Sequence, residues 1–501
     1  MKKIVGLPLI ILIFIFACNS DNMGPSKKTF MVICFDVEDY TSPESAGMDD
    51  IPKWLAEILT EEDITGSFFV IGEKARSMKK RGREDVIKAM AKHDIGSHTN
   101  YGSIHPTVTE ILEKAAWNEG ITTMLKNESA GFNDLEEIFG KRPNTLARHG
   151  GSYGPQLVAS LSQLGAAFIY SPISLPEHNA IWFCNTLNFH GEGDFGFFDD
   201  TYHRDDLFDP LFQELEEKIP ELTKGVEVVS FFANHPSKVR SIQFWDFNYY
   251  KGANPSPDEW KTPELRPLET METAKKNFRR LVRYLKEQDD IELTTYGKLA
   301  EEFSIQKEKI SKEKLQNIAF KVIESESIII DNLYSPSEIF AALSTSLSNY
   351  EANGNLLQKI YIRRPFGPEE MPITEPEIKK VSIEQGLLLA SQSNNFIDEQ
   401  NQLPTELAIN GNKIGTGSLL ALFCNIYIDL VINEEKRGYQ VNNFQGYPNY
   451  NEEKILEEVM NCKYWPVHRD DLDLNSLVEM TKRQLWTLKP AYTKKQLLAF
   501  K

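Results

Sequence analysis

The chain has 501 residues, of which 41% are hydrophobic and 26% are charged. This composition is ordinary for a folded protein of more than one domain, and it excludes collagen, a coiled coil, wholesale disorder and a polytopic membrane protein. Because 55 lysines and arginines face 73 aspartates and glutamates, the formal net charge is −18, and non-specific binding to nucleic acid is not expected. Five cysteines without a Cys-x-x-Cys pair argue against a disulfide framework or a cysteine-based zinc site.

The N-terminal sequence is typical of an export signal followed by a tether. A short basic segment precedes the apolar run 4–17, which is too short to span a bilayer comfortably and is typical of a signal peptide. The run ends in a small residue before Cys18, which resembles a bacterial lipobox and implies lipidation of that cysteine. We therefore predict a lipoprotein-type signal peptide over 1–18, a tether over 19–27, and an exported protein of the cell envelope held to the membrane through Cys18. Plain secretion and an uncleaved anchor are the alternatives.

From residue 28 onward, short apolar runs typical of buried strands alternate with stretches of helical periodicity. The predicted strands are 30–35, 67–71, 94–97, 145–147, 167–170, 226–232 and 291–294. The predicted helices are 51–60, 84–92, 107–126, 156–164 and 273–287, the third of them opened by a capping box from Thr107 to Glu110. This alternation predicts an α/β fold with βα units around a parallel sheet or barrel.

A charged segment, 306–315, then predicts a linker to a C-terminal accessory module over 316–501, which we expect to be a smaller α/β or α+β region. Two stretches in it, 328–368 and 406–448, share the order strand, turn, helix and closing proline, which suggests a weak duplication. The second stretch is faintly similar to cell-wall-binding repeats of the pseudomurein-binding type, and this similarity implies glycan or cell-wall binding. A packing or interaction domain without glycan affinity is the alternative.

Polar residues follow the ends of four predicted strands: Asp36, His98, Arg148 and His235. In α/β folds the carboxyl ends of parallel strands form the edge at which active sites are built. Any one of these residues alone is commonly a helix cap, an ion-pair partner or a structural side chain. Their occurrence at successive strand ends of one domain indicates a site.

The residue types in these clusters point to hydrolysis. Two imidazoles and a carboxylate are a typical ligand set for a metal ion that keeps positions open for water. A second carboxylate could take a proton from that water, and a separate histidine could protonate a leaving group. An arginine could hold the base ionised, and the backbone N–H groups of a glycine-rich turn could stabilise an oxyanion. Together these groups suit the hydrolysis of an amide or an ester.

The order and surroundings of these residues resemble the NodB-homology polysaccharide deacetylases, carbohydrate esterase family four. The similarity covers about 28–303, so we assign 28–305 to a polysaccharide deacetylase-like domain. The segments that carry it are Phe-Asp-Val-Glu at 35–38, Thr-Gly-Ser-Phe-Phe-Val-Ile-Gly at 65–72, Ile-Gly-Ser-His-Thr at 95–99 with His-Pro at 105–106, Arg-His-Gly-Gly-Ser-Tyr at 148–153, and 228–235.

This resemblance implies a distorted (β/α) barrel that removes N-acetyl or O-acetyl groups from a polysaccharide with the help of a divalent metal, zinc first and cobalt or nickel as alternatives. It implies that Asp36 is the catalytic base, that Arg148 orients it, that Tyr153 offers its backbone N–H to the oxyanion, and that His235 protonates the departing amine. It further implies that Glu38, with Asp39 as its competitor, joins His98 and His105 as metal ligands.

The sequence departs from the family's pattern in several places. Val37 separates Asp36 from Glu38, where the family has adjacent aspartates, and the two histidines stand seven residues apart (105 − 98) instead of four. The arginine motif lacks its proline at 149 or 150, and the Asp/Trp motif has only a loose counterpart at 194–200. Two other hypotheses therefore stay open: a degenerate domain that binds glycan without turnover, and hydrolysis of a small amide or ester. We expect the remaining histidines to be structural or surface residues, with His149 and His203 the first exceptions to consider.

Overall fold

The structure is a computed structural model that describes residues 28–190, 198–222, 228–433 and 438–500. The predicted signal peptide, the tether and Cys18 lie outside the described residues. Within these ranges, no helix is both long enough and apolar enough to cross a bilayer.

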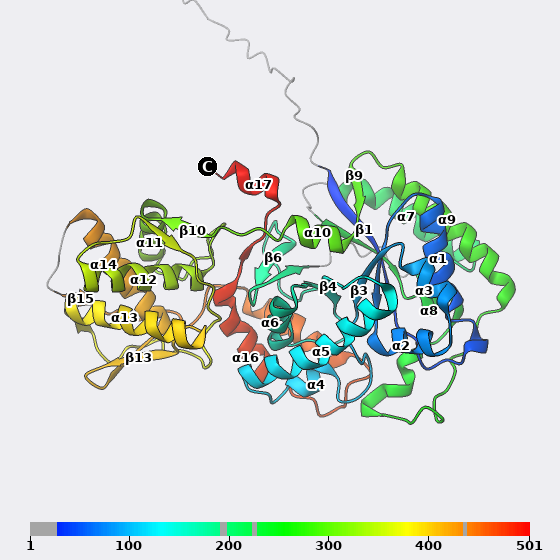
Figure 1. The fold of residues 1–501 in the computed structure, drawn as a ribbon, viewed down its shortest axis with the longest axis horizontal. Helices are drawn as coiled ribbons and strands as arrows, with labels where there is room; N and C mark the ends of the chain where they lie inside the picture. The colour runs from blue at the N-terminus through cyan, green and yellow to red at the C-terminus, as the bar shows by residue number, and fades with distance from the viewer. Residues whose placement is uncertain (1–27, 191–197, 223–227, 434–437, 501) are drawn as a thin grey trace, which may run out of the picture.

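The N-terminal lobe is built on a curled, half-barrel sheet of ten strands (Figure 1), in agreement with the predicted α/β fold. Strand β1 (Thr29–Val37) is central: it pairs in parallel with β8 (Val228–Asn234) on one side and with both β2 (Ser67–Val70) and β9 (Ile291–Thr294) on the other. Beyond β2 the parallel strands continue with β3 (Asp94–Ser97), β4 (Thr145–Ala147), β5 (Ala167–Ile169) and β7 (Thr186–Phe189). The antiparallel strands β6 (Ala180–Phe183) and β16 (Lys489–Pro490) complete that end of the sheet.

Helices cover this sheet because its parallel strands are apolar on both faces. They are α1 (Asp50–Glu61), α2 (Gly72–Lys80), α3 (Glu84–Met90), α4 (Val108–Leu112), α5 (Trp117–Phe139), α6 (Pro155–Leu164), α7 (Asp205–Leu222), α8 (Pro236–Arg240), α9 (Met271–Lys286) and α10 (Tyr296–Glu302). The predicted helix 107–126 is two helices, α4 and α5, and its predicted capping box is present at Thr107 and Glu110. Helix α2 was not among the helices expected from the sequence.

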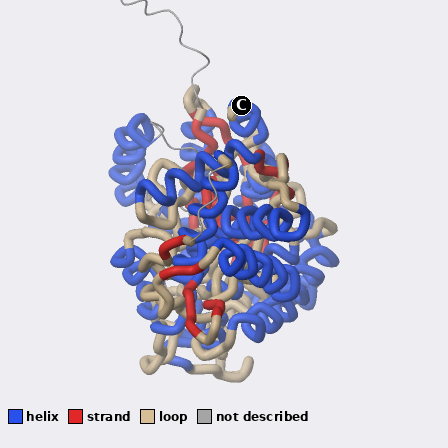
Figure 2. The backbone as a smooth tube through the Cα atoms, turned by 90° about the vertical axis from the view of Figure 1, so that its left-hand side faces the viewer, coloured by secondary structure: helices blue, strands red, loops and turns tan. Residues whose placement is uncertain are grey.

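A second lobe, on the left of Figure 1, is mainly helical and has a hydrophobic core of its own, drawn from residues 310–444 with Trp486. Its helices are α11 (Lys312–Ser325), α12 (Pro336–Asn353), α13 (Ile383–Gln400) and α14 (Thr416–Ile432). Three small antiparallel pairs accompany them: β10 (Lys309–Ser311) with β11 (Lys359–Tyr361), β12 (Lys380–Val381) with β15 (Tyr439–Gln440), and β13 (Glu406–Ile409) with β14 (Asn412–Gly415). Figure 2, turned by 90°, shows these helices in front of the strands of the large sheet.

The two stretches of the suggested duplication fold differently. The first contains α12 and β11 with no strand at 328–331, whereas the second contains the β13–β14 hairpin, α14 and β15. The predicted linker 306–315 is likewise not a plain connection, because β10 and the first turn of α11 lie in it.

After the second lobe the chain returns to the first. Helices α15 (Glu452–Asn461) and α16 (Asn475–Gln484) pack in the same hydrophobic cluster as α4, α5 and α6, strand β16 joins the large sheet, and α17 (Lys494–Ala499) ends the chain. The expectation of one accessory module over 316–501 therefore needs a correction. Residues 310–444 form the core of the second lobe, but most of the segment after 450 belongs to the core and sheet of the first lobe.

Candidate active site

Strand β1 delivers two carboxylates to one face of the sheet. Its odd-numbered residues 31–37 pack in one hydrophobic cluster, while Val32 and Cys34 pack in another on the opposite face. Because side chains alternate along a strand, Asp36 and Glu38 continue the face of Val32 and Cys34. The intervening Val37, which departs from the family's pattern, is thus the spacer that keeps both carboxylates on one side.

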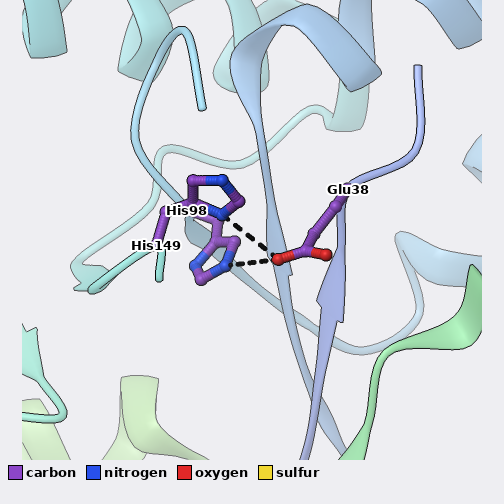
Figure 3. A group of neighbouring side chains, drawn as sticks. All are labelled: Glu38, His98 and His149. Carbon is purple, nitrogen blue, oxygen red and sulfur yellow. Dashed lines mark hydrogen bonds and ion pairs between the residues drawn. The ribbon is translucent and has the colours of Figure 1, made fainter. Parts of the chain in front are cut away.

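Glu38 meets two histidines from neighbouring strand ends (Figure 3). Its Oε1 lies 3.1 Å from Nε2 of His98, which follows β3, and 3.1 Å from Nδ1 of His149, which follows β4. All three side chains are buried, and one ligand atom from each lies within 4.8 Å of the others. Its other oxygen, Oε2, accepts a hydrogen bond of 2.9 Å from the indole N–H of Trp245.

The far side of each imidazole is held in place. Nδ1 of His98 lies 3.1 Å from the carbonyl of Ala147, which can only accept, so Nδ1 carries the proton and neutral His98 presents a lone pair on Nε2. Nε2 of His149 lies 3.0 Å from the hydroxyl of Ser103, while its Nδ1 is buried without an aligned hydrogen bond. Two imidazoles and a carboxylate, each fixed by an outer partner, form a donor set that suits a divalent ion of the zinc type.

Asp36 lies next to this group and near a second histidine. Its Oδ2 is 3.5 Å from Nε2 of His98 and 4.0 Å from Nε2 of His235, and its Oδ1 is buried with no hydrogen-bond partner among the described residues. Nδ1 of His235 is 3.3 Å from Oδ2 of Asp199, which also accepts from the backbone N–H of His235 at 3.1 Å. Asp199 lies in 194–200, the loose counterpart of the Asp/Trp motif.

The environment separates the pKa values of these groups. Burial raises the pKa of Asp36 to about 6, although the nearby histidines oppose the shift. Burial disfavours the ionised form of Glu38 as well, but the positive charge of His235 and the two bonded histidines hold the pKa of Glu38 well below its usual range. For His235 burial acts in the lowering direction, and Glu38 and Asp199 outweigh it and raise the pKa to about 9. Near pH 7 the site therefore contains an ionised carboxylate that can accept a proton and an imidazolium that can donate one.

Four of these side chains, Asp36, Glu38, His149 and His235, line a pocket of about 310 Å³. Its lining consists of Asp36, Glu38, His149, Gly150, His235, Phe244, Asp246, Tyr250, Trp465 and Pro466. His98 lies behind Glu38 and is fully buried. The reactive groups thus face a small space of the size that holds a ligand.

His105 does not join this group, and its predicted place beside Glu38 and His98 has to be corrected. Its Nδ1 is 2.7 Å from the carboxylate of Glu110, and its Nε2 is 3.0 Å from the carbonyl of Tyr249, so neither ring nitrogen is directed at Glu38. The second histidine beside Glu38 is His149, whose Nδ1 lies 3.1 Å from Oε1 of Glu38. Among the histidines not assigned to the site, His149 was one of the two named as exceptions to a structural or surface role, and its place just after a strand end, shared with the other site residues, is the signal that could have identified it.

Arg148 and Tyr153 are not directed at the reactive groups either. The guanidinium of Arg148 lies 3.5 Å from the sulfur of Cys462 instead of orienting Asp36. The backbone N–H of Tyr153 donates to the hydroxyl of Thr109 at 2.8 Å, so it is already engaged and does not offer itself to an oxyanion.

Asp39, the competitor of Glu38, has a structural environment. One carboxylate oxygen accepts from the backbone N–H groups of Thr41 and Ser42 at 3.1 and 3.0 Å, and the other accepts from the Ser42 hydroxyl at 2.7 Å. Asp39 thus fixes the turn that follows β1.

The fold and the site define an α/β protein with a buried group of two histidines and carboxylates at the carboxyl edge of a half-barrel sheet. A family model described as polysaccharide deacetylase matches residues 24–169, and this segment is therefore of the polysaccharide deacetylase type. A comparison with curated protein sequences gave no match.

Several solved structures are similar to the chain. A putative polysaccharide deacetylase from Mycobacterium smegmatis has 16% identity, with 56% of this chain and 92% of that chain covered and a TM-score of 0.35. A probable polysaccharide deacetylase from Pseudomonas aeruginosa has 11% identity, the same coverage of 56% and 92%, and a TM-score of 0.36. A pseudoenzyme of the CE4 family from Bacillus anthracis has 14% identity, coverage of 55% and 66%, and a TM-score of 0.30. At these values the likeness carries no functional argument.

Proposed function

We propose that this chain is a metal-dependent hydrolase that removes acetyl groups from a polysaccharide. The proposal is supported chiefly by one arrangement: the buried group Glu38, His98 and His149 lies beside Asp36 and the His235–Asp199 pair, and most of these side chains line one pocket. The match of residues 24–169 to the polysaccharide deacetylase family supports an acetylated polysaccharide as substrate.

In this proposal Glu38, His98 and His149 hold a divalent ion, zinc first and cobalt or nickel as alternatives. When bound, such an ion acidifies water and polarises a carbonyl group. Asp36 takes a proton from the attacking water, whose oxygen adds to the acetyl carbon. His235, held by Asp199, gives a proton to the leaving atom: to the nitrogen of an N-acetyl group as the C–N bond breaks, or to the sugar oxygen of an O-acetyl group as the C–O bond breaks. Acetate and a free amine, or acetate and a free hydroxyl, then leave.

The test is the release of acetate by the purified, zinc-loaded protein from acetylated glycans: an N-acetylglucosamine tetrasaccharide, peptidoglycan and acetylated xylan fragments. We expect Asp36→Asn to retain zinc and to lose at least about a hundredfold in rate, the lower range of general-base catalysis. Asp209→Asn, on the exposed surface of α7, is the matched control and should behave as the wild type. No acetate from any glycan, with zinc bound, would overturn the proposal.

Binding of glycan without turnover is the second candidate function. It is favoured by the absence of two expected groups, because neither Arg148 nor the Tyr153 N–H is directed at the reactive centre. Retention of the tetrasaccharide by a zinc-loaded protein that releases no acetate would support this function. Acetate release from a small amide or ester, and from no glycan, would instead support the third hypothesis.

We also propose export to the cell envelope with a lipid on Cys18, on the strength of the lipobox-like segment. Incorporation of a labelled fatty acid by the wild type, and its loss in Cys18→Ser, is the expected result. Equal labelling of both proteins would refute this attachment.

A further inference from the structure

The mouth of the pocket is formed by two segments that are far apart in the chain. One is the kinked 3-10 helical segment Trp245–Gly252, and the other is the returning segment 462–467, which contributes Trp465 and Pro466 to the lining. Backbone N–H groups of Lys251 and Gly252 donate to the carbonyls of Pro466 and Val467 at 2.9 and 3.0 Å. The returning segment is therefore hydrogen-bonded to the end of the 3-10 helical segment and forms a second wall of the pocket.

Trp465 presents a fixed aromatic ring on this wall. Its ring centre lies 5.0 Å from that of His149, with an interplanar angle of 88°. It also lies directly over Gly150, where an added Cβ would come within 2.3 Å of the indole, so only glycine allows this approach. Held by these neighbours and half-buried, the indole contributes part of its surface to the pocket lining.

Asp246 is a buried carboxylate on the same wall. It is 4% exposed, and its Oδ1 has no hydrogen-bond partner among the described residues. A buried polar atom without a partner is costly, and a ligand that donates a hydrogen bond would remove that cost. Its neighbours along the wall are aromatic: Phe244, Tyr250 and Trp465.

We infer that Trp465 and Asp246 recognise a pyranose ring of the substrate, so that the C-terminal segment contributes directly to glycan binding. This inference rests on the proposed function and narrows it to sugars with free ring hydroxyls. The apolar face of a pyranose packs on an aromatic ring, and its hydroxyls donate to a carboxylate. The pocket volume of about 310 Å³ suits one sugar unit, with the rest of the chain outside.

The test measures binding of N-acetylglucosamine tetrasaccharide and of O-acetylated xylotetraose by calorimetry, in an Asp36→Asn background that prevents turnover. We expect Trp465→Ala and Asp246→Asn each to weaken binding of the preferred tetrasaccharide by about tenfold, since loss of a packed aromatic ring or of a hydrogen-bond acceptor in a buried site costs about 1.5 kcal/mol. Tyr464→Ala, 74% exposed and outside the pocket lining, is the control and should bind as the parent does.

A second pair of variants guards against misfolding. Trp465→Phe should retain most of the affinity, whereas Trp465→Leu, which keeps an apolar side chain without an aromatic face, should lose it. The inference would be overturned if Trp465→Leu and Asp246→Asn both bound the sugar with the affinity of the parent. If the protein with Asp36 intact released acetate from the same sugar, the proposed function would nevertheless stand. A wild type that neither binds nor deacetylates either sugar would overturn both.

Discussion

We expect the zinc affinity of this protein to fall in a graded order when three side chains are truncated. His149→Ala removes a nitrogen that lies 3.1 Å from Glu38. Ser103→Ala leaves that nitrogen in place and removes the hydroxyl 3.0 Å from the other side of the ring. His105→Ala removes a ring bonded to Glu110 and to a backbone carbonyl, away from Glu38.

The expected magnitudes follow from these positions. Loss of a partner that orients a metal ligand costs about 10- to 100-fold in metal affinity, or about 1.4 to 2.8 kcal/mol, which is the range expected for Ser103→Ala. His149→Ala removes the ligand itself and should exceed about 100-fold. His105→Ala should leave the affinity unchanged within about twofold, because its ring has no contact with the donor group.

The assay is competition for zinc between the metal-free protein and a coloured chelator, with the melting temperature of each variant recorded to show that it is folded. The order His149 > Ser103 > His105 is the expected outcome. A folded His105→Ala variant that loses zinc while His149→Ala retains it would refute the ligand set and restore the set implied by the family's spacing.

Three further predictions concern the surroundings of the site. Glu38→Gln should lose zinc, whereas Asp39→Asn should retain it at reduced stability, because Asp39 is occupied by the turn after β1; elemental analysis of both variants decides. Burial raises the pKa of Glu128 to about 8 from 4.5, so as pH rises this side chain ionises in the unfolded chain before it ionises in the folded protein. The free energy of unfolding should therefore fall by up to about 5 kcal/mol between about pH 5 and 9. Glu128→Gln should raise the melting temperature at pH 9 and not at pH 5, and equal shifts at both pH values would contradict this. Lys489→Met removes the buried ammonium group 2.7 Å from the Glu338 carboxylate and leaves Arg364, at 3.1 Å, as the ion-pair partner of that carboxylate. The variant should therefore lose about 2 kcal/mol in chemical unfolding, less than a wholly unpaired buried charge would cost, and no loss would contradict this.

The strands were predictable where a short apolar run ends abruptly. Strands β4 (Thr145–Ala147) and β9 (Ile291–Thr294) have the predicted bounds, and the capping box at Thr107 opens α4 as expected. Helix α2 was missed because its sequence, Gly-Glu-Lys-Ala-Arg-Ser-Met-Lys-Lys, has few apolar residues from which a period could be read. The contacts that stabilise this helix come from distant parts of the chain, among them the buried ion pair at 2.5 Å between Lys74 of α2 and Asp49.

Four residues of the candidate site, Asp36, Glu38, His98 and His235, could be found because each stands at or just after a strand end. The positions of His105 and His149 could not be predicted from local spacing. In the sheet, Ser97 is in register with Leu146, so His98 continues beside Ala147, two residues before His149. Residues two apart share a face, and this pairing of β3 with β4, invisible in a single sequence, brings the two imidazoles together.

The position of Trp465 was even less predictable from the sequence. It lies 316 residues after His149 (465 − 149), and its ring nevertheless packs against that histidine. Nothing in the sequence around this tryptophan indicates which strand end it contacts in the folded protein. Only the return of the chain, fixed by β16 pairing with β6 and by the core around α15 and α16, brings it to the pocket.

The expected histidine beside Glu38 was His105 and the one found there is His149, and this difference has a physical basis in how such sheets are built. The carboxyl ends of β1, β3 and β4 meet at one edge, so a side chain one or two residues beyond any of them can reach the same point in space. A histidine one helical turn after His98 is thus one solution among several, and a residue following β4 supplies an equivalent nitrogen 3.1 Å from Glu38. Loss of the local histidine pair therefore does not by itself imply loss of the metal, and a sequence with an altered step should be judged by which other strand ends carry imidazoles. If His149→Ala abolishes zinc binding in this protein, that criterion holds for a donor group assembled from three separate strands.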